Sequence, residues 1–204
     1  MLTAFTAALL LITISELGDK TFFIGVILAT RYARRWVFLG VTFALAAMTI
    51  LSVLAGQVLS FLPPIYLRYA EVLLFLGFGV KLLWDARQMS DTPCAEEETE
   101  ALEAVEGVEQ QRRRKRPLQV ILEAFGLTFV AEWGDRTQIA TIALAAAHPP
   151  LGVVSGAVLG HGICALIAVM GGRAIAQHLS EKRLTLLGGS LFLIFAATAA
   201  WRLA

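Results

Sequence analysis

Two short stretches place charged side chains inside strongly apolar segments, and both follow the same pattern. The first is ELGDKT at residues 16–21, and the second is EWGDRT at residues 132–137. In each stretch a glutamate and an aspartate stand three positions apart, about 60° around a helix, so both carboxylates can share one face. The glycine between them loosens the helix and lets carbonyl oxygens act as ligands where the backbone lines a cavity.

The formal charges of the two stretches leave an excess that a cation can balance. The four carboxylates are those of Glu16, Asp19, Glu132 and Asp135, and the two opposing cations are Lys20 and Arg136. The remaining charge of −2 is neutralised by one divalent cation or by two protons, which suits a site that exchanges one for the other. Oxygen ligands favour calcium, manganese or magnesium. Neutral oxygens nearby belong to Thr21, Thr137, Ser15 and Gln138, and the flexible points are Gly18 and Gly134.

The elements that must position these residues are apolar enough to lie in a membrane. The 204 residues are 57% hydrophobic, with a mean hydropathy of +0.71, well above a typical soluble domain. A helix needs about 20 apolar residues to cross a bilayer, and an ion at its centre costs about 3 kcal/mol on insertion scales. The charged groups of both motifs must therefore face one another, water or a bound ion.

Six apolar segments are predicted to be helices, and prolines or charges separate them. Pro63-Pro64 and Pro149-Pro150 cannot continue a helix. The first segment has no basic stretch before it, so we expect it to be retained rather than removed as a signal peptide. The predicted helices span residues 2–30, 36–61, 66–88, 118–147, 151–174 and 182–203.

The two halves of the chain resemble each other. A shift of 116 residues superposes the two motifs and places Gly40 on Gly156, and one residue more places LFLGFG at 74–79 on LFLIFA at 191–196. Since three crossings end on the opposite side, the second half enters upside down. The predicted fold is an all-α integral membrane protein with six transmembrane helices as two inverted three-helix repeats. The first repeat spans 1–89, a charged, solvated linker 90–117, and the second repeat 118–204.

The distribution of basic residues predicts the orientation. Eight of the 16 acids lie between Asp91 and Glu109, and the run Arg112–Arg116 follows them. Loops on the linker side carry 12 Lys and Arg residues, whereas the other side has Arg68 and Arg202. The positive-inside rule therefore places the linker in the cytoplasm and both termini outside. The expected location is a bacterial inner membrane, with a thylakoid or other internal membrane as the alternative.

The doubled motif E-x-G-D-[KR]-[ST], one copy in each half, resembles that of the manganese/calcium cation–proton exchangers, a family that includes the Golgi and chloroplast manganese transporters. The resemblance extends over nearly the whole chain. It implies a transporter that moves Mn²⁺ or Ca²⁺ against H⁺, and that is not an enzyme. By the same resemblance, Glu16, Asp19, Glu132 and Asp135 are the ion ligands, with Thr21 and Thr137 in support.

Other interpretations stay open at this point. The charged clusters could be structural salt bridges, and the protein could be a passive channel, an exporter of another small solute or a non-transporting assembly factor. His161 could relay protons, bind the ion or only pack, and Glu123 could lie at the cytoplasmic entrance. Cys94 and Cys164 form no CxxC site. No nucleic-acid module, phosphate loop or nucleophile–base pair is recognisable, no cofactor is expected, and the oligomeric state is open.

Overall fold

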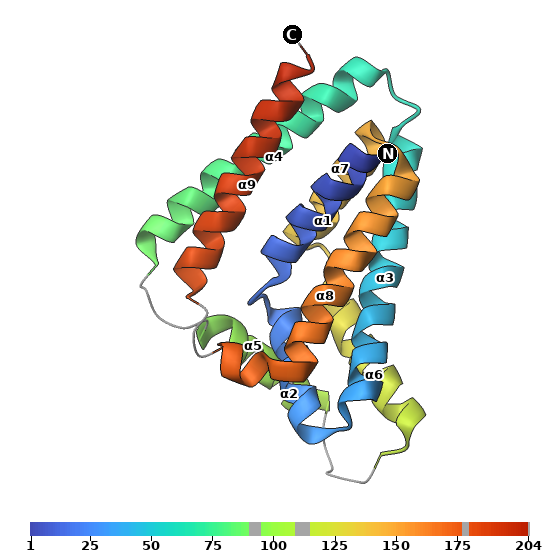
Figure 1. Ribbon diagram of the computed structural model, residues 1–204, viewed down its shortest axis with the longest axis vertical. Helices are drawn as coiled ribbons and strands as arrows, with labels where there is room; N and C mark the ends of the chain where they lie inside the picture. Colours follow the sequence, from blue (N-terminus) through green and yellow to red (C-terminus); the bar gives the residue numbers. More distant parts are fainter. Residues whose placement is uncertain (90–94, 109–114, 177–179, 204) are drawn as a thin grey trace.

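The computed structural model describes residues 1–89, 95–108, 115–176 and 180–203, and all the elements that it describes there are helices (Figure 1). Both chain ends lie toward the upper end of Figure 1, while α5 and the starts of α3 and α6 lie at the lower end. We call the lower end the linker side. The helices are α1 Leu2–Glu16, α2 Lys20–Arg31, α3 Arg34–Leu59, α4 Pro64–Gln88, α5 Ala95–Val108, α6 Pro117–Ala131, α7 Arg136–Ala147, α8 Pro150–Ala176 and α9 Glu181–Trp201.

Four of the six predicted helices are single helices with ends close to the predicted ones, namely α3, α4, α8 and α9. The other two predictions, 2–30 and 118–147, need correction, because each is two helices separated at a motif. The α1 and α2 axes are bent by 64°. Gly18 and Gly134 have φ values of 82° and 84° at these breaks. This left-handed conformation is strained for residues with a Cβ atom, so it ends the helix where glycine stands.

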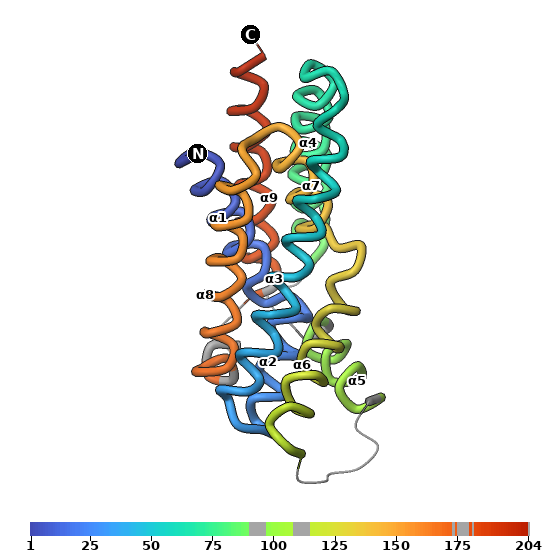
Figure 2. Tube along the Cα trace, turned by 90° about the vertical axis from the view of Figure 1, so that its right-hand side faces the viewer, coloured from blue at the N-terminus to red at the C-terminus, as the bar shows by residue number. Residues whose placement is uncertain are grey.

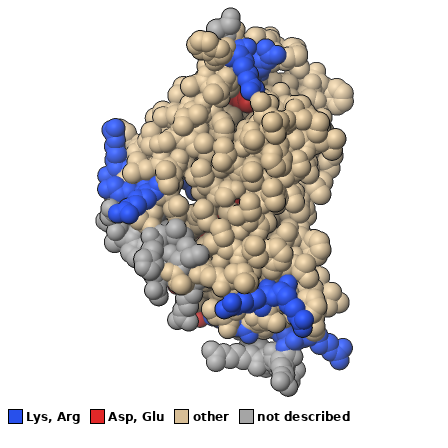
Figure 3. Space-filling model, in the orientation of Figure 1, with Lys and Arg blue, Asp and Glu red and all other residues tan. Residues whose placement is uncertain are grey.

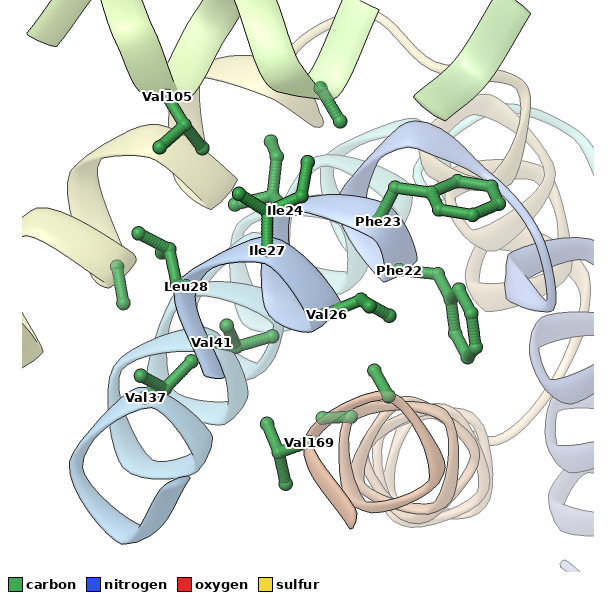
Figure 4. Close-up of a cluster of buried hydrophobic side chains, with 14 of the residues drawn as sticks. Phe22, Phe23, Ile24, Val26, Ile27, Leu28, Val37, Val41, Val105 and Val169 are labelled. Atoms are coloured by element: carbon green, nitrogen blue, oxygen red, sulfur yellow. The ribbon is translucent and has the colours of Figure 1, made fainter. Parts of the chain in front are cut away.

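The linker contains a helix that the sequence interpretation did not include. Helix α5 contacts α2, and its Ala101 and Val105 are fully buried. Figure 4 shows Val105 pointing toward Ile24 of α2. These two small apolar side chains, four residues apart, form one helix face among many acids. Most of the basic run Arg112–Arg116 lies outside the described residues, as does Cys94.

Three described helices, α3, α8 and α9, are long and apolar enough to cross a membrane, and the bent pair α1–α2 makes a fourth if it is one span. The same length and composition criteria do not select α4 or the α6–α7 pair. Helix α4 carries several charges, among them Arg68, Glu71 and Lys81, and the second motif interrupts α6–α7.

The surface of the bundle carries large apolar side chains in the manner of a protein in lipid. In Figure 3, Lys and Arg gather at the upper end, the left edge and the lower end, and few charges lie between them. Strongly exposed examples are Phe43, Leu54, Leu73, Trp84, Leu122, Val130, Leu166 and Ile194.

The helices pair in a pattern that relates the two halves. Helix α1 packs along α8, and α3 packs along α6 (Figure 2). Both pairs approach closely at a glycine: a Cβ atom on Gly40 would lie 2.6 Å from the carbonyl oxygen of Ile121, and one on Gly156 would overlap that of Phe5. The 116-residue shift relates Gly40 to Gly156 and Phe5 to Ile121, so these two contacts are equivalent.

Helices α4 and α9 pack against each other, but, within the described part of the chain, the pair contacts only part of the rest of the bundle. Helix α4 contacts α7 and α9 contacts α1. The repeat-related pairs, α9 with α2 and α4 with α6, make no comparable contact among the described residues. The α4–α9 pair therefore packs on the half of the bundle that lies away from the linker.

Candidate metal site

The breaks in the two helices bring the motif acids to helix ends in the interior. Glu16 is the last residue of α1, and Asp19 precedes the first residue of α2. In the second half, Glu132 follows α6 and Asp135 precedes α7. The amino ends of α2 and α7 carry partial positive charge and unpaired amide groups, which favour a nearby carboxylate.

Three of the four acids form a cluster that could hold a metal ion. Glu16, Asp19 and Glu132 each offer a carboxylate oxygen, and these atoms lie within 4.8 Å of one another. Glu16 and Glu132 are only 2% and 3% exposed, and Oε1 of each is buried without a hydrogen-bond partner. Carboxylates buried so close together require protons or a cation between them.

Asp135 does not join this cluster, although the motif places it like Asp19. Its Oδ2 accepts hydrogen bonds from the backbone N–H and the hydroxyl of Thr137, both at 3.0 Å. In the first half, the Thr21 hydroxyl instead donates to Oε2 of Glu16, at 3.3 Å. Equivalent threonines thus support different acids in the two halves.

The remaining motif residues surround the cluster. Lys20 and Arg136 form no ion pair within 4.0 Å in the part of the chain that the structure describes. The Ser15 hydroxyl is buried without a partner, and Oε1 of Gln138 accepts a hydrogen bond from the Gly134 amide at 2.8 Å. Lys20 and Arg136 therefore offset part of the negative charge of the motif acids without forming a direct ion pair with any one of them.

A cavity of about 90 Å³ reaches the cluster from the linker side. Asp19 and Arg136 line it beside the acid cluster, and Met89, Glu97 and Leu184 line it near the linker. Its wall includes parts of α4, α5 and α9, together with the broken turn between α1 and α2. The site is thus approached from the end of the molecule that carries the linker.

On the opposite side of the bundle, an ion-pair geometry joins α4 to the end of α7. Nε2 of His148 lies 2.8 Å from Oε1 of Glu71, and both side chains are largely buried. This contact holds α4 against the end of α7, on the side of the bundle away from the linker.

The two further polar residues considered from sequence have definite positions. Glu123 of α6 pairs with Lys115, whose ammonium also lies over the ring of Tyr32, 5.2 Å from its centroid. Burial lowers the pKa of Lys115, but its bonds to Glu123 and Tyr32 outweigh this and hold the pKa above its usual value. Glu123 therefore lies in a linker-side contact between α6 and the end of α2.

His161 lines a small cavity beside Glu132 and Thr137, together with Thr49 and Ser52 of α3 and Thr141 of α7. The sequence interpretation missed these three hydroxyl residues. The signal available was their spacing, since Thr49 and Ser52 are three apart and share a face of α3, as do Thr137 and Thr141 on α7.

The chain matches one family model over almost its whole length. The model, described as "Divalent cation/proton antiporter GDT1", matches residues 4–90 and 120–204. A GDT1-like protein of Synechocystis sp. is 61% identical over 202 residues, which cover 98% of each chain. No solved structure matches this chain.

Chloroplast proteins of plants are also similar. The chloroplastic GDT1-like protein 2 of Oryza sativa is 44% identical over 207 residues, which are 95% of this chain. The chloroplastic PAM71 homologue of Arabidopsis thaliana is 43% identical over 209 residues, which are 96% of this chain. The chain spans 60% and 58% of the length of these two relatives.

Proposed function

The chain belongs to the GDT1 family of divalent cation/proton antiporters, and on this premise we propose that it exports manganese, or less readily calcium, from the cytoplasm in exchange for protons. Family membership makes it a multi-pass membrane transporter rather than an enzyme. The proposed location is a bacterial inner membrane, with a thylakoid membrane as the alternative.

The observation that carries this proposal is the buried cluster of Glu16, Asp19 and Glu132. Its oxygen ligands suit a hard divalent cation, and two of its oxygens lack any other partner. We propose that Asp135 joins the ligands in another conformation, once Thr137 releases it. Lys20 and Arg136 then keep the empty site from carrying the full charge of four carboxylates.

We also propose the complete topology: six spans in two inverted repeats, with the linker in the cytoplasm and both termini outside. The equivalent contacts of Gly40 with Ile121 and of Gly156 with Phe5 support the repeat. In this topology α4 and the α6–α7 pair also span the bilayer. The charges of α4 would lie near its ends, and the second motif would face the protein interior.

The uneven packing of α4 and α9 supports an inward-facing conformation. Their contacts with α7 and α1 close the outer half, and the cavity that reaches Asp19 opens toward the linker. Exchange of these contacts for their repeat-related counterparts would expose the same site to the outside, as inverted repeats allow. Binding a divalent cation and binding protons would compete, so apparent metal affinity should rise with pH.

The test uses purified protein in liposomes that contain a pH-sensitive dye, with the membrane potential clamped. Manganese added outside should make the lumen more alkaline as protons leave in exchange, and calcium should do so more weakly. Asp19→Asn should abolish the response, because it removes one charge from the cluster. Asp85→Asn on α4, which lines no part of the site, is the matched control and should respond like the unchanged protein.

Each alternative gives a different result in this assay. Manganese entry that is indifferent to an imposed proton gradient would favour a passive channel over antiport. A protein that moves neither ion, whatever the gradient, would favour an assembly factor or the export of another solute. Full activity in Asp19→Asn would mean that the ion site lies elsewhere.

A further inference from the structure

Two small cavities flank the acid cluster, and the repeat relates one to the other. Each has about 10 Å³, room for about one water molecule or ion. One, which we call the outer chamber, lies between α3, α7 and α8 beside Glu132. The other lies between α2, α3 and α8 beside Glu16. The 116-residue shift superposes most of their lining residues.

The two chambers have opposite chemistry although they are equivalent in position. In the outer chamber, four polar residues stand where the other chamber has apolar ones. Thr49, Ser52, Gln138 and His161 correspond to Ala165, Ala168, Phe22 and Leu45. Packing alone does not require buried polar groups here, since the equivalent chamber is closed by apolar side chains.

Three polar side chains of the outer chamber, those of Thr49, Ser52 and His161, have lone pairs that can bind a cation. The hydroxyls of Thr49 and Ser52 donate to the carbonyl oxygens of Leu45 and Met48, so their lone pairs remain available. His161 is 5% exposed, and its Nδ1 is buried without a hydrogen-bond partner. A buried nitrogen without a partner is unfavourable unless something that the chamber admits binds to it.

The outer chamber also adjoins the ion site, because it shares lining residues with that site and with the larger cavity. Thr137 lines both this chamber and the larger cavity that opens toward the linker, and Glu132 belongs to both the chamber and the acid cluster. An ion that leaves the cluster away from the linker therefore meets the Thr49, Ser52 and His161 side chains next.

We propose that the outer chamber is a second, transient cation site on the outward path, and that Nδ1 of His161 makes it favour manganese over calcium. The inference rests on the proposed function. Calcium takes oxygen ligands, whereas a transition-metal ion also accepts an imidazole nitrogen. Apart from the Glu132 carboxylate that it shares with the cluster, the chamber offers neutral hydroxyls and one nitrogen, which bind a cation weakly and suit a site that must release its ion.

The experiment measures manganese and calcium transport by the same protein in liposomes, each as a rate over a range of concentrations. His161→Gln should lower the transport efficiency for manganese by about tenfold, the scale of effect seen when a metal site loses one supporting group. Calcium transport should change far less, so the manganese-to-calcium ratio falls. His148→Gln is the matched histidine control. Its transport rate can differ from that of the wild-type protein, but its manganese-to-calcium ratio should be the same.

A second variant tests the oxygen ligands separately. Thr49→Ala introduces the residue that stands at the equivalent position, and it should slow transport of both ions. Thr42→Ala removes a hydroxyl two turns earlier on α3, outside the chamber, and should have no effect. An unchanged manganese-to-calcium ratio in His161→Gln would overturn the proposal, whether both ions lose rate equally or neither does, and so would unchanged rates in Thr49→Ala. If the unchanged protein transports neither ion, the proposed function itself fails.

Discussion

At the scale of single residues, a substitution at Gly134 tests the backbone conformation of the site without changing its charge. Its φ of 84° lies in the left-handed region, and a Cβ atom there would meet no heavy atom within 4 Å. Gly134→Ala therefore adds backbone strain of about 1–2 kcal/mol without a steric clash. We expect the variant to unfold at a lower temperature, which tryptophan fluorescence in detergent would measure. We also expect a lower rate of the proposed manganese transport, because Glu132 and Asp135 flank the strained turn.

Gly126 of α6 provides the matched control for this change. A Cβ atom there also meets nothing within 4 Å, but the residue has ordinary helical geometry. Gly126→Ala should keep or slightly raise stability, since alanine favours helix over glycine by about 1 kcal/mol. If Gly134→Ala proved as stable and active as Gly126→Ala, the left-handed turn would not be a requirement of the site.

The motif acids could be identified from sequence because charged groups in apolar segments are costly and two copies share one spacing. The different positions of Asp19 and Asp135 could not. Each follows a glycine and precedes a basic residue and a threonine, and the hydrogen bonds from Thr137 to Asp135 depend on how the second half packs. His161 could be noted but not assigned, since the chamber around it forms only when α3, α7 and α8 meet.

At the scale of elements, the docking of α5 on α2 depends on very few side chains. Val105 is fully buried, whereas its neighbour Leu102 is 40% exposed. Val105→Asp removes apolar burial of about 1.5–3 kcal/mol and places a charge against Ile24. We expect α5 to detach and the linker to be cut faster by a protease added on its side of the membrane. Leu102→Asp is the control, and equal cleavage of both variants would show that α5 is not held by this face.

The long helices were predictable from sequence because apolar length and proline breaks determine them. The helix in the linker was not, since it has as many acids as apolar residues, and among its described side chains Ala101 and Val105 alone are buried. The breaks at Gly18 and Gly134 were suggested by the glycines, but a glycine alone does not say whether a helix loosens or ends. Its positive φ comes from the surrounding packing.

At the scale of the whole molecule, the proposed inverted repeat allows a second conformation to be predicted from the one described. The Glu71–His148 contact joins α4 to the end of α7. Shifts of 117 and 116 residues relate these positions to Gly188 of α9 and Tyr32 at the end of α2. Gly188 now lines the cavity on the linker side. Closure of that side should therefore bring Gly188 and Tyr32 together while Glu71 and His148 separate.

Paired cysteines and a short bifunctional thiol reagent test this exchange in a protein whose own cysteines are replaced by serine. Glu71→Cys with His148→Cys should crosslink in the conformation described here. Tyr32→Cys with Gly188→Cys should crosslink only in the alternative one. Adding Glu71→Gln to the second pair should raise its yield, because loss of the His148 bond weakens closure of the half away from the linker and shifts the population toward the alternative conformation. A yield at Tyr32 and Gly188 that stays at background, with and without Glu71→Gln, would contradict exchange between repeat-related contacts. Such a result would indicate that the α4–α9 pair stays in the position described here.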